Sequence, residues 1–192
     1  MKVFWKFSGF LFLYKNEIRA KGKFRIRGWP AVINKGIIYF DGDVDFRSSV
    51  KSTPLGVTNP VFLHTMSSDS TIRLGHGVGV SGAVICCMKS ITIGDGVMIG
   101  SGAMICDSDF HSLDHRVRRT EHDLEHAVTL PVLIGDNCFI GARSIILKGV
   151  ELGDRTIVGA GSVVTRSFPS DVVVAGNPAR IIKKLNSYNL DG

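Results

Sequence analysis

Aliphatic residues recur at every sixth position through the second half of the chain. From Ile134 to Pro169 the sequence reads IGDNCF, IGARSI, ILKGVE, LGDRTI, VGAGSV and VTRSFP. The first position of each block is aliphatic, and glycine follows it in four of the six blocks, with Leu147 and Thr165 as the departures. The fifth position is small or β-branched in every block except the last, where it is Phe168.

A period of six matches neither the repeat of a helix face, about 3.6 residues, nor the alternation of a single strand. It matches short flat strands that are joined by tight corners and that each place one aliphatic side chain inward. Glycine, with the Asp, Asn or Gly near it, supplies the turn conformations that larger side chains resist. Stacked coils then bury the aliphatic column and pair their backbone groups between layers, which predicts an all-β solenoid.

The same rhythm extends upstream and is interrupted by one long insertion. Blocks begin at Leu74, Val80, Ile93, Ile99 and Ile105. The next block begins 29 positions later, at Ile134, and 29 is not a multiple of six. The intervening stretch, HSLDHRVRRTEHDLEHAVTLP, is charged and lacks the aliphatic column. We therefore predict an excursion from the coil at about residues 106–132, where a rigid scaffold commonly carries binding and chemistry.

The composition is that of one β-rich domain. The chain has 192 residues, is 44% hydrophobic and carries 22 glycines spread along its length. Its four cysteines, Cys86, Cys87, Cys106 and Cys138, form no CxxC pair and lie in apolar settings. We therefore expect reduced, buried thiols in a cytoplasmic protein, and neither a zinc ribbon nor a disulfide framework. The net charge of +6 favours an anionic partner without choosing one.

The N-terminal stretch, MKVFWKFSGFLFLYK, is basic and aromatic. Lys6 interrupts its apolar run, no small-residue cleavage site follows, and the run is too short to span a bilayer. Two uses stay open: packing against the body of the protein, or peripheral contact of residues 1–15 with the inner face of a membrane. We divide the chain into an N-terminal segment (1–22), a coil (23–171) and a C-terminal tail with a short helix (172–192).

The repeats, the histidine-bearing excursion and the ending VVVAGNPARIIKKL together resemble the hexapeptide-repeat acyltransferases. The sequence looks most like the maltose and galactoside O-acetyltransferases and their surface-polysaccharide relatives, over about residues 70–185. The resemblance implies a left-handed parallel β-helix, triangular in section with three hexapeptides per turn, which is an exception to the right-handed crossover rule. It also implies a homotrimer with active sites between subunits, acetyl-CoA as acyl donor and a sugar or glycan acceptor.

His111, in DSDFHSLDH at the start of the excursion, falls where that family places its catalytic histidine. An imidazole can take the proton of a sugar hydroxyl as the hydroxyl oxygen attacks the thioester carbonyl, so that no acyl-enzyme is needed. Asp107 and Asp109 are candidates for orienting the ring or binding a substrate hydroxyl, and the sequence does not choose between them. By resemblance, the oxyanion contact falls on a backbone N–H at the corner formed by Gly141 and Ala142.

The resemblance also places contacts to acetyl-CoA in the last third of the chain. The positions are Phe139, Gly141, Ala142, Ala160, Thr165, Arg166, Arg180 and Lys183. Ala160 and Thr165 match backbone contacts to the pantetheine arm, and the three cations match positions where fixed charge meets the nucleotide and its phosphate. Phe139 stands where relatives often carry tryptophan, so it flanks the pantetheine or only packs.

Two departures from the family pattern limit what can be carried over. Ser81 stands where the galactoside and maltose enzymes carry an asparagine that contacts the acceptor, so the identity of the acceptor does not transfer. The stretch at residues 24–49 lacks the acidic helical region of those enzymes, and we expect irregular opening coils there.

Three other functions stay open beside sugar O-acetylation. N-acetylation of an amino sugar nucleotide would use the same base and donor. A metal enzyme like the γ-type carbonic anhydrases would use His76, His111 and His115, with His122 and His126 as further donors. Those enzymes lack this excursion and this basic ending, so we expect no metal. A non-catalytic β-helix would leave His111 as a solvated loop residue. We predict an acetyl-CoA-dependent O-acetyltransferase of surface polysaccharide biosynthesis, with no nucleic-acid partner.

Overall fold

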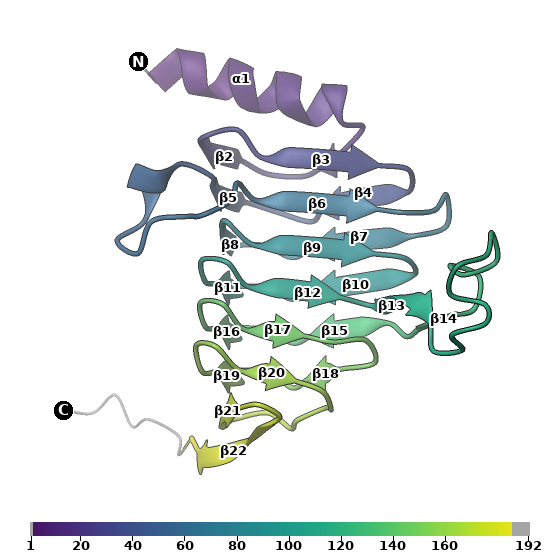
Figure 1. The fold of residues 1–192 in the computed structure, drawn as a ribbon. Coiled ribbons are helices and arrows are strands. Elements are labelled where there is room, and N and C mark those ends of the chain that lie inside the picture. The colour runs from purple at the N-terminus through teal and green to yellow at the C-terminus, as the bar shows by residue number, and fades with distance from the viewer. Residues whose placement is uncertain (1, 186–192) are drawn as a thin grey trace.

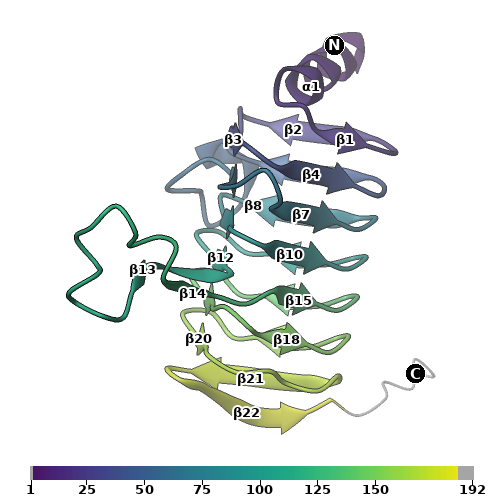
Figure 2. The same cartoon turned by 90° about the vertical axis from the view of Figure 1, so that its right-hand side faces the viewer.

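The computed structural model describes residues 2–185 of the chain and the side chains of residues 9–185. Short strands wind into a three-sided prism, and helix α1 (Lys2–Lys15) lies across one end of it (Figure 1). A ribbon made by β13 (Ser108–Ser112) and β14 (Ala127–Thr129) projects from one edge of the prism (Figure 2). The architecture is the left-handed parallel β-helix that the sequence predicts.

Three sheets form the sides of the prism, named sheets A, B and C. Sheet A contains β1 (Arg19–Ala20), β4 (Ile37–Phe40), β7 (Thr71–Leu74), β10 (Ser90–Ile93), β15 (Val132–Ile134) and β18 (Glu151–Leu152). Sheet B contains β2 (Phe24–Arg27), β5 (Val44–Arg47), β8 (Val78–Ser81), β11 (Met98–Ile99), β16 (Phe139–Ile140), β19 (Ile157–Val158), β21 (Val172–Gly176) and β22 (Ala179–Lys184). Sheet C contains β3 (Ala31–Asn34), β6 (Phe62–Thr65), β9 (Val84–Cys87), β12 (Met104–Cys106), β17 (Ile145–Ile146) and β20 (Val163–Val164).

The six-residue period accounts for the register of these sheets. Ile134 pairs with Leu152, Ile140 with Val158 and Ile146 with Val164, so each coil contains 18 residues and three hexapeptides. All six of these side chains are buried, and full burial of such an aliphatic side chain stabilises the fold by about 1.5–3 kcal/mol. The predicted aliphatic column is therefore confirmed.

Aromatic side chains fill the prism beneath the helix. Phe12 of α1 stacks on Phe24 with ring centroids 5.6 Å apart, and Phe24 meets the edge of Phe46 at 5.2 Å. Gly9 lets the helix approach closely, because a Cβ there would lie 3.2 Å from the carbonyl oxygen of Phe24. Helix α1 thus closes the open end of the apolar interior.

A column of side chains links successive coils along the edge between sheets A and B. Each of these side chains accepts a hydrogen bond from a backbone N–H in the coil nearer the helix. The acceptors are Asp43, His76, Asp95, Asp136 and Asp154, at 2.7–3.2 Å from the nitrogens of Lys23, Asp43, His76, Asp95 and Asp136. The column fixes the stagger of neighbouring coils, because each bond is made only in one register.

Two expectations about the ends of the coil are wrong. The opening coils are regular, since β2 and β5 pair in parallel over four residues, as do β3 and β6. The C-terminal tail has no helix in its described part: β22 pairs antiparallel with β21, through a turn at Asn177 and Pro178. The turn residues of the Gly-Asn-Pro stretch at 176–178 therefore favour a hairpin in this part of the tail. Residues 186–192 lie outside the described residues.

Candidate active site

The β13–β14 ribbon leaves the prism at the edge between sheets C and A, where the sequence places the excursion. The pairing of the two strands is irregular between Ser108 and Ser112, where the register shifts as it does at a β-bulge. Within the bulge Phe110 has φ of 60°, an unusual value for a bulky residue and one that costs about 1–3 kcal/mol. A bulge of this kind re-aims the next side chain, and that side chain is His111.

His111 is held by a carboxylate from the far side of the excursion loop. Its Nδ1 lies 2.6 Å from Oδ2 of Asp123, whose other oxygen accepts the backbone N–H of Ser112 at 2.7 Å. The imidazole is 68% exposed, whereas the Asp123 side chain is only 16% exposed. The bond from His111 holds the pKa of the Asp123 carboxyl below its ordinary value, so the carboxylate is ionised at neutral pH. When Nδ1–H is donated to the Asp123 carboxylate, Nε2 is the nitrogen of the neutral imidazole that can accept a proton.

Asp109 pairs with a lysine of the next coil and not with His111. Its Oδ1 lies 2.6 Å from Nζ of Lys148, and both side chains are about one-quarter exposed. Lys148 follows β17 at the same edge of the prism, so the ion pair fastens the root of the ribbon to the coil below. It also places a fixed positive charge beside the strand that carries His111.

Asp107 is a structural residue, and the expectation that it orients His111 or binds substrate is wrong. Its side chain is fully buried, and its two oxygens accept the backbone N–H groups of Met88, Lys89 and Ser90 at 2.7–2.8 Å. The carboxylate therefore closes the corner between β9 and β10 and has no face toward solvent. Asp107 precedes β13 and its carboxylate stays with the coil, whereas His111 lies further out on the ribbon, so closeness in sequence did not predict closeness in space.

A groove of about 470 Å³ lies along another edge of the prism, between sheets B and C. Ala142 and Ala160, two of the positions matched to the acyl donor, line it together with Gly102 and Gly161 from the same column of corners. The loop between β5 and β6, which contains η1 (Val50–Ser52), covers one side of the groove through Leu55, Gly56 and Thr58. The small corner residues leave backbone groups accessible along the groove.

The corner formed by Gly141 and Ala142 has two backbone N–H groups that could make the expected oxyanion contact, and only one of them is available. The N–H of Gly141 donates to the carbonyl of Val158 at 2.8 Å, and a Cβ on Gly141 would collide with the nitrogen of Ala160 at 2.5 Å. Among the described residues no acceptor is seen for the N–H of Ala142, which is half-buried at the groove. The oxyanion assignment therefore narrows to Ala142.

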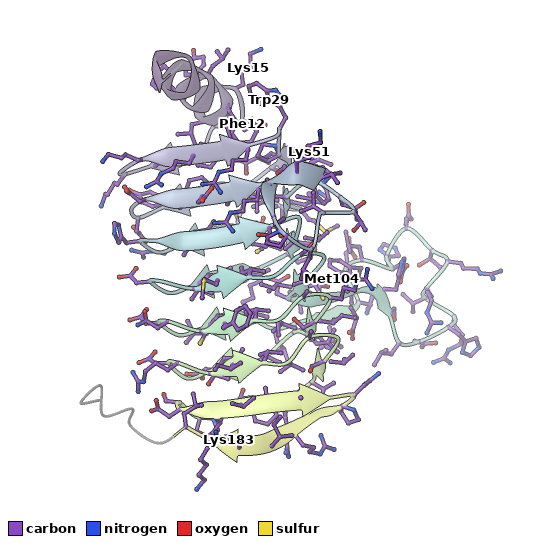
Figure 3. The ribbon with its side chains drawn as sticks, turned by 90° about the vertical axis from the view of Figure 1, so that its left-hand side faces the viewer. Phe12, Lys15, Trp29, Lys51, Met104 and Lys183 are labelled. Atoms are coloured by element: carbon purple, nitrogen blue, oxygen red, sulfur yellow. The ribbon has the colours of Figure 1, made fainter. Side chains whose placement is uncertain are left out.

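The remaining predicted residues are spread over the prism. Ser81 and Phe139 lie on the outer face of sheet B, in β8 and β16. Thr165 and Arg166 follow β20 at the edge below the excursion, where the guanidinium of Arg166 lies 5.3 Å above the Phe168 ring. Arg180 and Lys183 are exposed on β22, at the end of the molecule remote from α1 (Figure 3). A single chain thus keeps His111 on one edge and Ser81, Phe139 and Ala142 on other parts of the prism.

The histidines considered as metal donors do not converge. His76 belongs to the column between sheets A and B, where its Nδ1 accepts the N–H of Asp43. His122 contacts Glu125 within the excursion, at 3.1 Å. Within residues 2–185, no group of three or more His, Cys, Asp or Glu side chains is placed to hold a metal ion.

The four cysteines are free, as expected, and burial raises the pKa of each thiol. The value reaches about 11 for Cys86 and Cys138. These thiols are therefore protonated at neutral pH and are poor nucleophiles.

Sequence reasoning missed Asp123 and Lys148. Asp123 lies 12 residues beyond His111 in EHDLEH, where several carboxylates are equivalent by sequence. Lys148 had a usable signal, because it sits in the ILKGVE block, which departs from the glycine pattern at Leu147. The loop at residues 48–61 was also missed, because its PLGVTNP stretch carries no recognisable motif.

The coils of hexapeptides and their one histidine-bearing ribbon place the chain in the class of left-handed β-helix proteins. A family model described as "Hexapeptide repeat of succinyl-transferase" matches residues 131–166. Galactoside O-acetyltransferase of Escherichia coli (strain K12) is 36% identical over 97 residues, which are 50% of this chain and 45% of that protein. These matches confirm the resemblance to the hexapeptide-repeat acyltransferases, although the chain spans only about half the length of the curated relatives it matches.

Solved structures show the same fold. AntD, an N-acyltransferase from Bacillus cereus solved with dTDP and 3-hydroxybutyryl-CoA, superposes with a TM-score of 0.71 at 22% identity, covering 91% of this chain and 87% of that chain. The polysialic acid O-acetyltransferase OatWY superposes with a TM-score of 0.59 at 20% identity, covering 86% and 68%. At these identities the likeness concerns the fold alone.

Proposed function

We propose that the protein is an acetyl-CoA-dependent acetyltransferase that acts on a sugar hydroxyl in surface polysaccharide biosynthesis, with His111 as general base. The observation that carries the proposal is the pair formed by His111 and Asp123 on the ribbon. This pair fixes the tautomer that leaves Nε2 free to accept a proton. The resemblance to sugar acetyltransferases supplies the class of donor and acceptor.

The proposed reaction is a direct transfer. The acceptor hydroxyl gives its proton to Nε2 of His111 as its oxygen forms a bond to the thioester carbonyl carbon. The negative charge that develops on the carbonyl oxygen is met by the N–H of Ala142. The carbon–sulfur bond then breaks, and the imidazolium returns the proton to the leaving CoA thiolate. Thr165, Arg166, Arg180 and Lys183 remain our candidates for holding the donor, and Ser81 and Asp109 for contacting the acceptor.

We infer a homotrimer because one chain does not assemble this constellation. His111 projects from the edge between sheets C and A, whereas Ala142 lies on the edge between sheets B and C. A neighbouring chain packed against sheet C would bring the two edges together. The outer face of sheet C suits such contact, since one column of paired residues on it is apolar throughout. This column comprises Ala31, Phe62, Val84, Met104, Ile145 and Val163.

Introducing a charge in this column is expected to dissociate the assembly. Met104 lies halfway along the stack (Figure 3), and Met104→Lys would bury an unpaired ammonium at the interface. Light scattering during size-exclusion chromatography should show the mass fall from trimer to monomer. Leu133→Lys, on the outer face of sheet A with similar exposure, is the matched control and should remain trimeric. If the wild type is a monomer, or if Met104→Lys remains a trimer, the proposed interface on sheet C is excluded.

The carboxylate of Asp123 is expected to act through His111. Asp123→Asn should lower kcat by about 10- to 100-fold, less than the ~10⁴-fold seen for a buried triad aspartate, because this pair lies at the surface. The KM for acetyl-CoA should stay unchanged. In the His111→Ala background the same substitution should have no further effect on the rate, since residues that act as a unit are not additive. A further loss of rate in that background would show that Asp123 only maintains the structure of the loop.

The function is tested by a screen of acceptors. Release of CoA from acetyl-CoA would be followed with free sugars, nucleotide-linked amino sugars and lipid-linked glycans. The proposal expects turnover on a hydroxyl-bearing sugar, with a product that mild alkali cleaves, because an ester is labile and an amide is not. An alkali-stable product would establish N-acetylation instead. Absence of acceptor-dependent turnover across the panel would reject the enzymatic function.

A further inference from the structure

The positive charge of the chain is concentrated at its N-terminal end. Residues 1–35 contain nine Lys or Arg and one Glu, a net charge of +8, whereas the remaining 157 residues contain fourteen basic and sixteen acidic residues, a net charge of −2. Residues 2–35 form α1 and the first coil, so this charge lies at one end of the prism (Figure 1). The cations of the β13–β14 loop and of β22, in contrast, lie among carboxylates or at the far end of the molecule.

Large apolar side chains are exposed at the same end. Phe10 and Tyr14, one helical turn apart on α1, are 69% and 74% exposed, and Leu11 between them is also exposed. Trp29, in the first coil, is 62% exposed although its ring centroid lies 6.3 Å from that of Phe12. Phe12 itself is buried on Phe24. Helix α1 therefore uses one face to close the prism and presents a second apolar face to solvent.

Basic residues are exposed at the same end of the molecule. Lys15, Arg19, Lys21 and Lys23 are all exposed at the end of the helix or in the first strand and turn that follow it. Beside them, Arg25, Arg27 and Lys51 line a pocket of about 460 Å³ whose wall includes Phe24 and Ile26. Figure 3 shows Lys15, Trp29 and Phe12 together at the helix-capped end, with Lys51 just beneath and Lys183 at the opposite end. The pocket offers an anionic group both charge and apolar surface.

We propose that this end of the molecule, formed by α1, the first coil and Trp29, docks on a bilayer that contains anionic phospholipids. Phe10, Leu11, Tyr14 and Trp29 enter the boundary between headgroups and acyl chains, and the lysines and arginines pair with headgroup phosphates. The exposed aromatic and aliphatic side chains favour a bilayer over a nucleic acid, which would select the charge but not the apolar face. Docking is peripheral: α1 has 14 residues, and no described helix is long and apolar enough to cross a membrane.

Vesicle binding tests the proposal on the full chain. The protein would be sedimented with vesicles of phosphatidylcholine containing 30% phosphatidylglycerol, and with vesicles of phosphatidylcholine alone. We expect binding to the anionic vesicles that weakens as salt is raised. The double variant Phe10→Ser/Tyr14→Ser should bind at least tenfold more weakly. Each of Lys15→Gln and Lys21→Gln should lose about fivefold, the equivalent of about 1 kcal/mol per cation near the surface.

Matched controls separate docking from unfolding. Ile182→Ser removes a side chain of similar exposure, 65%, at the far end of the prism, and should bind as the wild type does. Circular dichroism would verify that the Phe10/Tyr14 variant keeps the wild-type melting profile. Equal binding of wild type and Phe10→Ser/Tyr14→Ser overturns the proposal. A second result would also overturn it: double-stranded DNA abolishes vesicle binding, and Phe10→Ser/Tyr14→Ser binds that DNA as well as the wild type does. The surface would then be a nucleic-acid site.

Discussion

Replacement of His111 by alanine is expected to lower kcat for acetyl transfer by about 100- to 10,000-fold, the usual contribution of a general base. The Nδ1 of this imidazole lies 2.6 Å from the carboxylate of Asp123, a partly exposed partner that fixes the tautomer of the ring. Because its side chain is largely exposed and contacts little else, the free energy of unfolding should barely change. Steady-state release of CoA and urea denaturation of the same preparation measure the two quantities.

His122→Ala is the matched control for this substitution. His122 is exposed on the same excursion and also pairs with a carboxylate, Glu125. It lies away from the bulge, so its loss should leave kcat unchanged. A His111→Ala enzyme that retains turnover within a few-fold of wild type would show that the base lies elsewhere or that the acceptor arrives already deprotonated.

Replacement of Asp107 by alanine is expected to destabilise the fold by about 3 kcal/mol or more. The carboxylate is fully buried and is the acceptor for three consecutive N–H groups at the corner between β9 and β10. Each buried donor left without an acceptor costs about 1–3 kcal/mol. Asp107→Asn should also destabilise the fold, because the NH₂ group of the new amide would face backbone N–H groups and cannot accept their hydrogen bonds. The midpoint of urea unfolding measures both effects.

Asp109→Ala provides the comparison two residues along the chain. Asp109 is partly exposed and makes one ion pair, with Lys148, and such pairs contribute about 0–1 kcal/mol. Its substitution should therefore cost far less than that of Asp107. Equal losses at the two positions would mean that the corner hydrogen bonds are replaced by water and that Asp107 has no special structural role.

The coil could be predicted from the sequence because its rule is local. Each hexapeptide has the same pattern of one inward aliphatic residue and one corner. Ile134, Ile140 and Ile146 therefore predict one strand in each of the three sheets without any long-range information. The excursion was predictable for the same reason, as the place where the rule fails. Its root at residue 107 and the return to the coil at β15 agree with the break in the period.

The partners of the site could not be predicted because they depend on how the excursion folds back. Nothing in the spacing of His111 and Asp123 distinguishes Asp123 from Asp109 or Asp114, and only the return of the loop brings it within 2.6 Å. The prediction of a helix in the tail failed for another reason. The spacing of apolar and basic residues in ARIIKKL suits a helix, but β21 has an open edge with which β22 pairs. Tertiary pairing outweighs local pattern at such an edge.

The stacking of coils fixes the axial distances between residues on different coils. Neighbouring strands in a sheet are about 4.8 Å apart, and in sheet B four steps separate β11, in the coil that releases the excursion, from β22, which carries Arg180 and Lys183. The axial offset between the coil that releases the His111 ribbon and these cations is therefore about 19 Å, and it changes only in whole strand spacings. Removing one 18-residue coil would bring the cations one strand spacing nearer to His111 while leaving every corner in register. In the proposed reaction, the length of donor that reaches from His111 to these cations would thus be set by the number of coils between them.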